Sequence, residues 1–306
     1  RRTPPPRQLH LELSCARLWV MVTWDDWRTR AVPIDVGGLS VATYRLGPAG
    51  ARSYTFCHGY PSASLDIAEV ASLLGDEWRL LALDMPGFGA SDKPPGHPYS
   101  IHGAADAVEA LWDATGTRAT LLVVHDYSVS VGQELLARRA EGHLGVALDG
   151  VVWMNGGLYP DLHRPTAGQQ LLLDPDHGAE VAAAVDRQAF VEGVRVTWGT
   201  RRPYDEALVG EIWRSMDERG GVALMHELLH YVADRRRHAD RWRAALEGAE
   251  LPMAFVWGDL DPVSGAHVME RLRGRRPDAR LVPLADVGHW PPLEAPDVVA
   301  DAIRGL

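Results

Sequence analysis

Asp126, Asp261 and His289 are the residues whose types and order along the chain could carry out covalent hydrolysis. Each of them follows an apolar segment that is typical of a buried strand. The first carboxylate could attack a substrate, the second could orient the imidazole, and the imidazole could then take a proton from water. Some catalytic triads have their members in this order along the chain, with the nucleophile first, the acid second and the histidine last. These residues therefore predict a hydrolase with a covalent intermediate on Asp126.

Asp126 stands between a predicted strand and a predicted helix. Residues 121–124 form an unbroken apolar run, and from residue 129 the apolar positions follow helical spacing. A carboxylate on such a sharp turn is held out of the sheet, with the positive end of the helix beneath it. Ser128 is an alternative nucleophile, but it would lengthen the strand beyond its apolar run. A helix N-cap is the other alternative role for Asp126, because Asp is common at that position.

The acid and the oxyanion hole complete the predicted site. Asp259 is the alternative to Asp261 as the acid, because both lie in the loop after the same apolar segment. Backbone N–H groups of Tyr60 and Tyr127 are expected to form an oxyanion hole, in which each donor contributes ~3 kcal/mol. Tyr60 belongs to the sequence His58-Gly59-Tyr60-Pro61, which could also be an ordinary turn. We favour the oxyanion hole because this loop should lie beside the strand that carries the nucleophile.

A carboxylate nucleophile suits substrates in which a saturated carbon carries the leaving group. It can open an epoxide or displace a halide, leaving an ester on Asp126 that water activated by His289 then hydrolyses. A Ser nucleophile would instead suit esters and amides. The sequence contains no evident metal-ligand cluster or dinucleotide-binding glycine pattern, so we expect an enzyme without a cofactor or metal.

Strand and helix signals alternate along the chain and predict an α/β fold, with a mostly parallel sheet flanked by helices. The expected strands are 30–36, 39–46, 53–57, 78–83, 121–124, 151–154, 252–257 and 280–284, the first two forming a hairpin. The expected helices outside the interruption described next are 64–75, 100–115, one from 129, 265–274 and 296–305.

The alternation stops between about 158 and 248, where the pattern is helical and no strand is convincing. We predict a helical lid over 158–248, inserted into a core made of 28–157 and 249–306. The site would then lie in the crevice between the lid and the strand ends. Residues 1–27 are expected to form a loose arm and then an amphipathic segment, packed on the body or on a second subunit as in a homodimer.

Composition limits the partners and the location. The chain has 31 basic and 41 acidic residues, a net charge of −10, which disfavours nucleic acid and anionic membranes as partners. Only Cys15 and Cys57 occur, so we expect no disulfide framework and a cytoplasmic location. Residues 11–22 are too few, and too charged, to span a bilayer. Lys93 is the only lysine, which is typical of a GC-rich bacterial gene.

Several motifs resemble the epoxide hydrolase and haloalkane dehalogenase branch of the α/β-hydrolase superfamily, and within it the mesoderm-specific transcript protein group. The resemblance runs from about residue 24 to the carboxy terminus. It rests on Trp24 and Trp27, His58-Gly59-Tyr60-Pro61, Gly87-Phe88-Gly89, Ser91-Asp92-Lys93-Pro94, His125-Asp126-Tyr127, Asn155-Gly156-Gly157, Pro160, His163-Arg164-Pro165, Leu229 to Tyr231, Arg241-Trp242, Asp261-Pro262-Val263 and His289. It implies the α/β-hydrolase fold with the nucleophile at the strand-to-helix elbow.

Departures from the family pattern shape the functional prediction. Dehalogenases of this branch hold the halide with an Asn after His-Gly and a Trp after the nucleophile, and Tyr60 and Tyr127 stand there in this chain. Epoxide hydrolases accept an aromatic residue after His-Gly and use two lid tyrosines as donors to the epoxide oxygen. Tyr231 matches the second of these tyrosines.

The first lid donor has no clear counterpart in this chain. Tyr204, Tyr159 or His163 would have to serve, and packing within the lid is the alternative role for each. We expect Tyr204, His163 and Asn155 to contact the substrate. Ser128 replaces the glycine that is usual in the family, which is a milder departure.

These observations predict an enzyme that opens epoxides of small to medium apolar organic molecules to vicinal diols, through an ester on Asp126 and with Tyr231 as a donor. The alternatives are a haloalkane dehalogenase, a Ser128 esterase, and a ligand-binding protein that keeps the same fold without catalysis.

Overall fold

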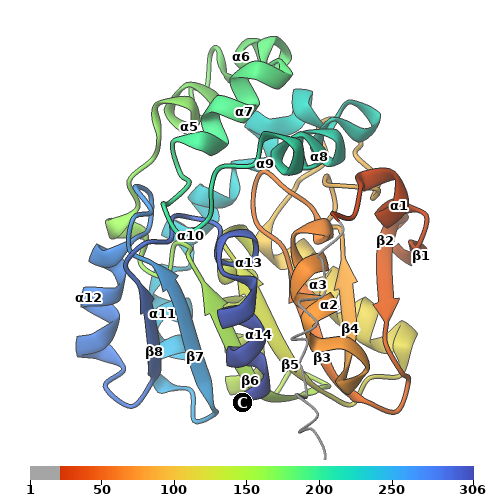
Figure 1. Cartoon of the computed structure of the whole chain (residues 1–306), viewed down its shortest axis with the longest axis vertical. Coiled ribbons are helices and arrows are strands. Elements are labelled where there is room, and N and C mark those ends of the chain that lie inside the picture. The colour runs from red at the N-terminus through yellow and green to blue at the C-terminus, as the bar shows by residue number, and fades with distance from the viewer. Residues whose placement is uncertain (1–20) are drawn as a thin grey trace, which may run out of the picture.

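Eight strands form one sheet in the order β1-β2-β4-β3-β5-β6-β7-β8, in a computed structural model that describes residues 21–306 (Figure 1). β1 pairs antiparallel with β2, and β2 with β4, while all other neighbours are parallel. The strands are β1 (Val32–Val36), β2 (Leu39–Leu46), β3 (Arg52–Cys57), β4 (Trp78–Leu83), β5 (Ala119–His125), β6 (Ala147–Met154), β7 (Met253–Gly258) and β8 (Arg280–Leu284). All eight expected strands are therefore present.

Side chains of β5 point alternately to two buried layers. Leu122 belongs to the buried layer that contains Trp112 of α3, and Leu121 belongs to the layer that contains Val299 of α14. Both faces of the central strand are thus covered, which explains its unbroken apolar sequence. The helices that flank the sheet are α2 (Ala68–Leu74), α3 (Ile101–Thr115), α4 (Tyr127–Ala140), α12 (Ala266–Arg275), α13 (Pro291–Glu294) and α14 (Pro296–Arg304).

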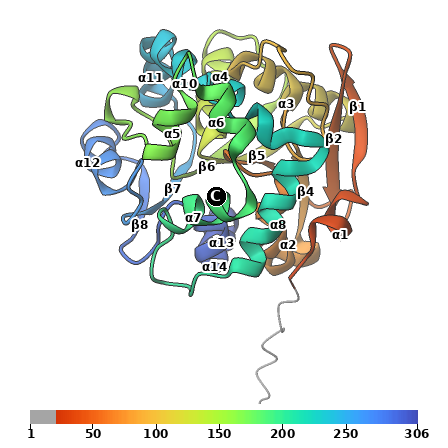
Figure 2. The same ribbon diagram turned by 90° about the horizontal axis from the view of Figure 1, so that it is seen from above.

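Between β6 and β7 the chain leaves the sheet, and we call residues 158–248 the helical insertion. All of these residues are described, and none of them is in a strand. The helices α5 to α9 lie over the strand ends, whereas α11 runs beside the sheet and packs on α4 (Figures 1 and 2). The insertion comprises η3 (Pro160–Leu162), α5 (Ala167–Leu172), α6 (Gly178–Ala184), α7 (Arg187–Arg195), α8 (Glu206–Asp217), η4 (Glu218–Leu224), α9 (Met225–Leu228), α10 (Tyr231–Arg237) and α11 (Ala239–Gly248).

Helix α1 (Trp24–Arg28) joins the insertion to the core. Trp27 stacks on Tyr44 and donates its indole N–H to Ser64 at 2.9 Å. Trp24 donates its indole N–H to Glu218 of the insertion at 3.0 Å. The described end of the expected amphipathic segment therefore packs on the body, and the expected arm and residues 11–20 lie outside the described part of the chain. Within residues 21–306, no helix combines the length and the apolar character needed to cross a membrane.

Candidate active site

Asp126 alone forms the turn between β5 and α4, with φ 46° and ψ −103°, a backbone conformation that is rare outside glycine. Asp126 occupies the N-cap position of α4, as the alternative role supposes, but its side chain makes no capping hydrogen bond to the helix. Instead, the Tyr60 N–H donates to Asp126 Oδ2 at 3.0 Å. Gly59 permits this approach, because a Cβ there would lie 3.0 Å from the Asp126 Cβ. The carboxylate is therefore held out of the sheet at the elbow.

Ser128 lies inside α4 rather than at the turn. Its side chain is fully buried, and its hydroxyl donates to the His58 carbonyl at 2.6 Å. This hydrogen bond ties the first turn of α4 to the loop after β3. The hydroxyl is therefore engaged with the backbone, and the elbow position belongs to Asp126.

The structure brings the three predicted triad residues together. His289 Nδ1 lies 2.7 Å from Asp261 Oδ2, and His289 Nε2 lies 3.7 Å from Asp126 Oδ1. Asp261, rather than Asp259, supplies the carboxylate at hydrogen-bond distance. The imidazole thus stands between two carboxylates, one of which orients it and one of which lies at the elbow.

Opposing effects set the pKa values of this pair. Burial works to raise the pKa of Asp261, but the charge of His289 and hydrogen bonds from His289, Ser264 and the Val263 N–H hold it well below its usual range. Burial works to lower the pKa of His289, but the charge and hydrogen bond of Asp261, with the charge of Asp126, raise it to about 9. The imidazolium is therefore stabilised by its two carboxylate neighbours.

Asn155 positions the acid. It is not among the residues that line the cavity beside His289, which is described below, and this corrects the expectation that Asn155 binds substrate. Its amide N–H₂ donates to Asp261 Oδ2 at 3.0 Å and to the Gly258 carbonyl at 2.9 Å. Its amide oxygen accepts from the Gly258 N–H at 2.7 Å. The side chain is completely buried. Asn155 therefore fixes Asp261 against the end of β7.

Glu294 holds the turn that carries His289, a role that no pattern in the sequence indicates. Its carboxylate accepts from the backbone N–H groups of Gly288 at 3.0 Å, Trp290 at 3.1 Å and Gly199 of the insertion at 2.7 Å. A glutamate at the end of a short helix is indistinguishable by sequence from a surface residue. One buried carboxylate thereby links the histidine turn to the insertion.

The insertion places a phenol beside the elbow. Tyr231, the first residue of α10, is buried with its ring centre 4.9 Å from that of Tyr127 and 6.4 Å from that of Tyr60. Burial raises the pKa of Tyr231 well above its ordinary value, and the charge of Asp126 adds to this, while Arg235 opposes it. The phenol therefore stays protonated at neutral pH. Tyr127 opens α4, where the first backbone N–H groups have no partner within the helix.

Of the residues considered as a further donor, His163 lies close enough to Asp126 and Asp261 for their charges to affect its pKa. Its Nε2 is buried without a hydrogen-bond partner among residues 21–306. Burial and Arg235 lower the pKa of His163 to about 4, while the charges of Asp126 and Asp261 oppose them. The imidazole is thus neutral at pH 7.

The Tyr204 hydroxyl is bound within the insertion, whereas the buried Tyr159 hydroxyl has no hydrogen-bond partner among residues 21–306. The Tyr204 hydroxyl donates to the Val191 carbonyl at 2.7 Å, and the ring lies under Arg195 at 4.0 Å. This packing inside the insertion corrects the expectation that Tyr204 contacts substrate. The Tyr159 ring lies against Arg271 of α12, with the guanidinium carbon 5.4 Å from the ring centre.

A cavity of about 280 Å³ lies between the insertion and the histidine turn. Tyr60 and His289 are among the residues that line it, and the other lining side chains are mainly aliphatic or aromatic. The apolar ones include Leu171, Leu172, Val181, Val185, Phe190, Val194, Met225, Val263 and Trp290. The cavity therefore suits an apolar molecule that reaches the triad with one polar end.

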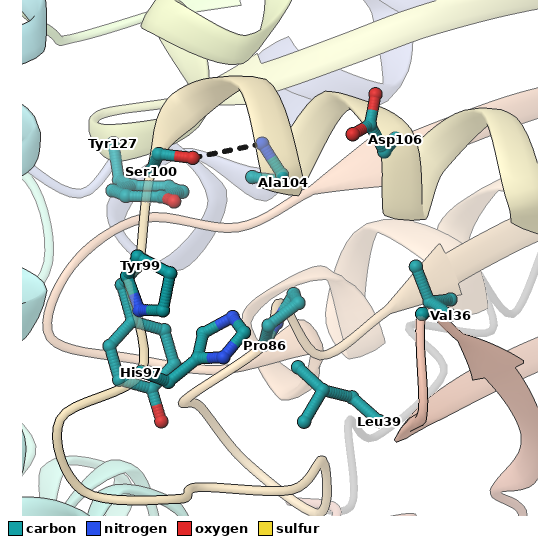
Figure 3. Close-up of a pocket in the computed structure, with 12 residues that line it drawn as sticks. Val36, Leu39, Pro86, His97, Tyr99, Ser100, Ala104, Asp106 and Tyr127 are labelled. Atoms are coloured by element: carbon teal, nitrogen blue, oxygen red, sulfur yellow. Dashed lines mark hydrogen bonds between the residues drawn. The ribbon is translucent and has the colours of Figure 1, made fainter.

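A second cavity, of about 250 Å³, lies beside the hairpin of β1 and β2 and the start of α3 (Figure 3). Tyr127 lines it together with Leu39, His97 and Tyr99. None of the triad residues lines this cavity. In the described part of the chain, no group of three or more His, Cys, Asp or Glu side chains is arranged to hold a metal ion.

Comparison with known proteins agrees with this fold. Residues 55–296 match the alpha/beta hydrolase fold family, and the chain belongs to that family. It is 35% identical over 284 residues to LipZ of Mycobacterium tuberculosis, covering 92% of this chain and 96% of that protein. It is 33% identical over 259 residues to the mesoderm-specific transcript homolog protein of Homo sapiens, covering 81% of this chain and 76% of that protein.

A solved structure shows the same fold. The haloalkane dehalogenase DbeA-M1 loop variant from Bradyrhizobium elkanii aligns with a TM-score of 0.71 at 22% identity, covering 90% of this chain and 96% of that one. The predicted α/β-hydrolase fold and the predicted resemblance to the mesoderm-specific transcript group are confirmed.

Proposed function

We propose that this chain is a hydrolase that opens epoxides to vicinal diols through a covalent ester on Asp126. The observation that carries the proposal is the carboxylate at the elbow, whose Oδ1 lies 3.7 Å from His289 Nε2. A carboxylate can displace a leaving group from a saturated carbon and so form an ester that water can cleave. A hydroxyl at the elbow would favour acyl transfer instead.

In the first proposed step, Asp126 Oδ1 attacks an epoxide carbon and the carbon–oxygen bond of the ring breaks. The electron pair stays on the epoxide oxygen, which takes a proton from the phenol of Tyr231. Tyr231 suits this role because its raised pKa keeps it protonated and its ring packs beside the elbow. His163, whose buried Nε2 has no partner in the described chain, is the proposed second donor to the same oxygen in its Nε2–H tautomer.

In the second step, His289 takes a proton from water and the resulting hydroxide attacks Cγ of Asp126. Asp126 Oδ2 becomes the oxyanion, and it already accepts the Tyr60 N–H at 3.0 Å. The Tyr127 N–H at the start of α4 is the proposed second donor. Esterification removes the Asp126 charge that helps to raise the pKa of His289, so the resting imidazolium releases its proton to solvent before hydrolysis, and it takes one back from solvent after the diol has left.

The tetrahedral intermediate then collapses and expels the diol. The departing alkoxide takes the proton that His289 holds, and the carboxylic acid of Asp126 returns a proton to Tyr231. The cycle therefore consumes one water and one epoxide. Asp261, fixed by Asn155, keeps the imidazole oriented through both proton transfers.

The cavity size and lining indicate a compact apolar substrate. At ~30 Å³ for each water-sized group, a cavity of about 280 Å³ holds roughly nine non-hydrogen atoms. Styrene oxide has this size and offers an apolar ring for the cavity and an epoxide for the triad. It is therefore the first substrate to test.

The test compares styrene oxide, 1-bromobutane and 4-nitrophenyl butyrate as substrates. We expect diol from the epoxide, loss of this activity in Asp126→Asn, and most of it kept in Ser128→Ala. Release of bromide without diol formation would favour a dehalogenase. Ester cleavage that survives Asp126→Asn and is lost in Ser128→Ala would favour an esterase, and either result would overturn the proposal.

A further inference from the structure

Arg235 of α10 is buried against the elbow, and its side chain is only 2% exposed. Its Nη2 donates to the Asp126 carbonyl at 2.9 Å, and its Nε donates to the Ser130 hydroxyl at 2.6 Å. The guanidinium carbon lies 4.5 Å from the centre of the Tyr231 ring. Gly157 leaves room for the group, because a Cβ there would lie 2.4 Å from Nη1. One side chain thus contacts both the elbow and the phenol.

Among residues 21–306, no carboxylate oxygen lies within 4.0 Å of a guanidinium nitrogen of Arg235. Two other arginines with little exposure are paired: Arg138 contacts Glu134 at 2.9 Å, and Arg276 contacts Asp278 at 2.8 Å. A buried charge without a partner is costly, and it is normally compensated by an opposite charge or by dipoles. The groups that face this guanidinium are a carbonyl, a hydroxyl and an aromatic ring, all of them neutral in the resting protein.

We propose that Arg235 is a positioning residue that stabilises the negative charge developing on Tyr231 as the epoxide opens. This inference rests on the proposed function. When the proton leaves the phenol oxygen for the epoxide oxygen, the electron pair of the O–H bond stays on Tyr231. The guanidinium over the ring face attracts this anion more strongly than it attracts the neutral ring.

The elbow contacts explain how the guanidinium is held in place. The hydrogen bonds to the Asp126 carbonyl and to Ser130 fix the plane of the group, so its charge cannot turn toward solvent. The arrangement is rigid before the reaction starts, and preorganised charge of this kind stabilises a transition state without reorganisation. Because Arg235 also belongs to the helix that begins at Tyr231, the phenol and its stabilising charge move together.

The neighbouring charges agree with this role. Arg235 works to lower the pKa of Tyr231, against burial and the charge of Asp126. The same guanidinium works to lower the pKa of the Tyr127 phenol and of His163, so its field also reaches these two neighbours of Tyr231. The adjacent Asp234 forms no ion pair with Arg235; its carboxylate accepts from the Ile101 N–H at 3.1 Å and lies near Arg237 at 3.9 Å.

A double-mutant cycle tests the inference with styrene oxide as the probe. Single-turnover mixing followed by intact mass spectrometry measures ester formation on Asp126. We expect Arg235→Met to slow ester formation about 30-fold when Tyr231 is present, but less than about 3-fold in a Tyr231→Phe background. Arg235→Lys, which keeps the charge, should recover part of the rate. Arg276→Met, which removes an arginine of similar burial, is the matched control and should leave the rate within about 3-fold.

The outcomes separate the two proposals. Absence of ester formation in the wild type would overturn the proposed function and this inference with it. Ester formation in the wild type, with equal losses from Arg235→Met in both backgrounds, would overturn the inference alone. If Arg235→Met does not fold by circular dichroism, the same comparison is made with Arg235→Lys, for which a loss that depends on Tyr231 supports the inference and an equal loss overturns it.

Discussion

Asp126 Oδ1 and His289 Nε2 lie 3.7 Å apart, so the charge of the proposed nucleophile acts directly on the proposed base. The charge of Asp126 is one of those that raise the pKa of His289 to about 9. An imidazolium that pairs with two carboxylates cannot accept a proton from water. Formation of an ester at Asp126 removes one of those charges, and the base becomes available when it is needed.

The first prediction concerns pH. Ester hydrolysis requires neutral His289, so its rate should rise with pH and level off above the pKa of the imidazole. In the ester this pKa should lie below the value of about 9 in the free protein, because the charge of Asp126 is absent. Rapid-quench measurement of ester decay across pH 5 to 10 gives the midpoint. A midpoint at or above the free-protein value, or a decay rate independent of pH, would count against the role of His289.

The second prediction concerns the phenol of the insertion. Tyr231→Phe removes the proton donor for the opening ring and should slow ester formation ~100-fold, while ester hydrolysis changes little. Tyr204→Phe is the matched control, because that hydroxyl is bound to the Val191 carbonyl. The measurement is single-turnover ester formation with styrene oxide. Equal effects of the two substitutions would show that Tyr231 has no special role.

The third prediction concerns the residue behind the acid. Asn155→Leu keeps the approximate volume but leaves Asp261 and the Gly258 backbone without their hydrogen bonds. Urea unfolding should show that the free energy of unfolding falls by ~1–3 kcal/mol. Ester hydrolysis should slow about 10- to 100-fold because the imidazole loses its orientation. Unchanged hydrolysis in a folded variant would show that Asp261 needs no support from Asn155.

The fourth prediction concerns stability and pH. Burial raises the pKa of Asp66 to about 7, although a hydrogen bond from Ser62 opposes this, and its Oδ2 has no partner among the described residues. The folded-state pKa thus exceeds the reference value of 3.8, so the unfolded chain releases the proton first. Stability should therefore fall as pH rises from about 4 to 7 through this group.

Asp66→Asn should remove that fall. The variant should be ~2 kcal/mol more stable than the wild type at pH 8 and similar to it near pH 4. Urea unfolding at both pH values gives the comparison, with Asp35→Asn on the exposed strand β1 as a control that should show no such difference. A variant that gains nothing at pH 8 would contradict the raised pKa of Asp66 in the folded protein.

The sheet and the triad could be predicted from the sequence because both depend on strands that are buried on two faces. Such strands are unbroken apolar runs, and a parallel sheet brings their ends to one edge. Asp126 and Asp261 are each close to such an end, so their proximity followed from the order of the strands. The turn that carries His289 completes the set.

The sequence does not show which residues of the insertion face the site. Its helices pack on one another as well as on the core, so helical periodicity does not tell which face meets the strand ends. Tyr204 was expected at the site because it is an aromatic residue of the insertion, but its hydroxyl is bound within the insertion. Arg235 lies in the run 234–237, which has the composition of a solvated helix face, and its burial depends on tertiary packing.

The most direct test of the covalent carboxylate is a variant that can form the ester but cannot hydrolyse it. His289→Gln lacks the base, so incubation with styrene oxide should add the mass of one substrate to the protein, and peptide mapping should locate it at Asp126. The double variant Asp126→Asn with His289→Gln should show no addition. An epoxide that the wild type hydrolyses but that leaves His289→Gln unmodified, or labels a residue other than Asp126, would contradict the proposed mechanism.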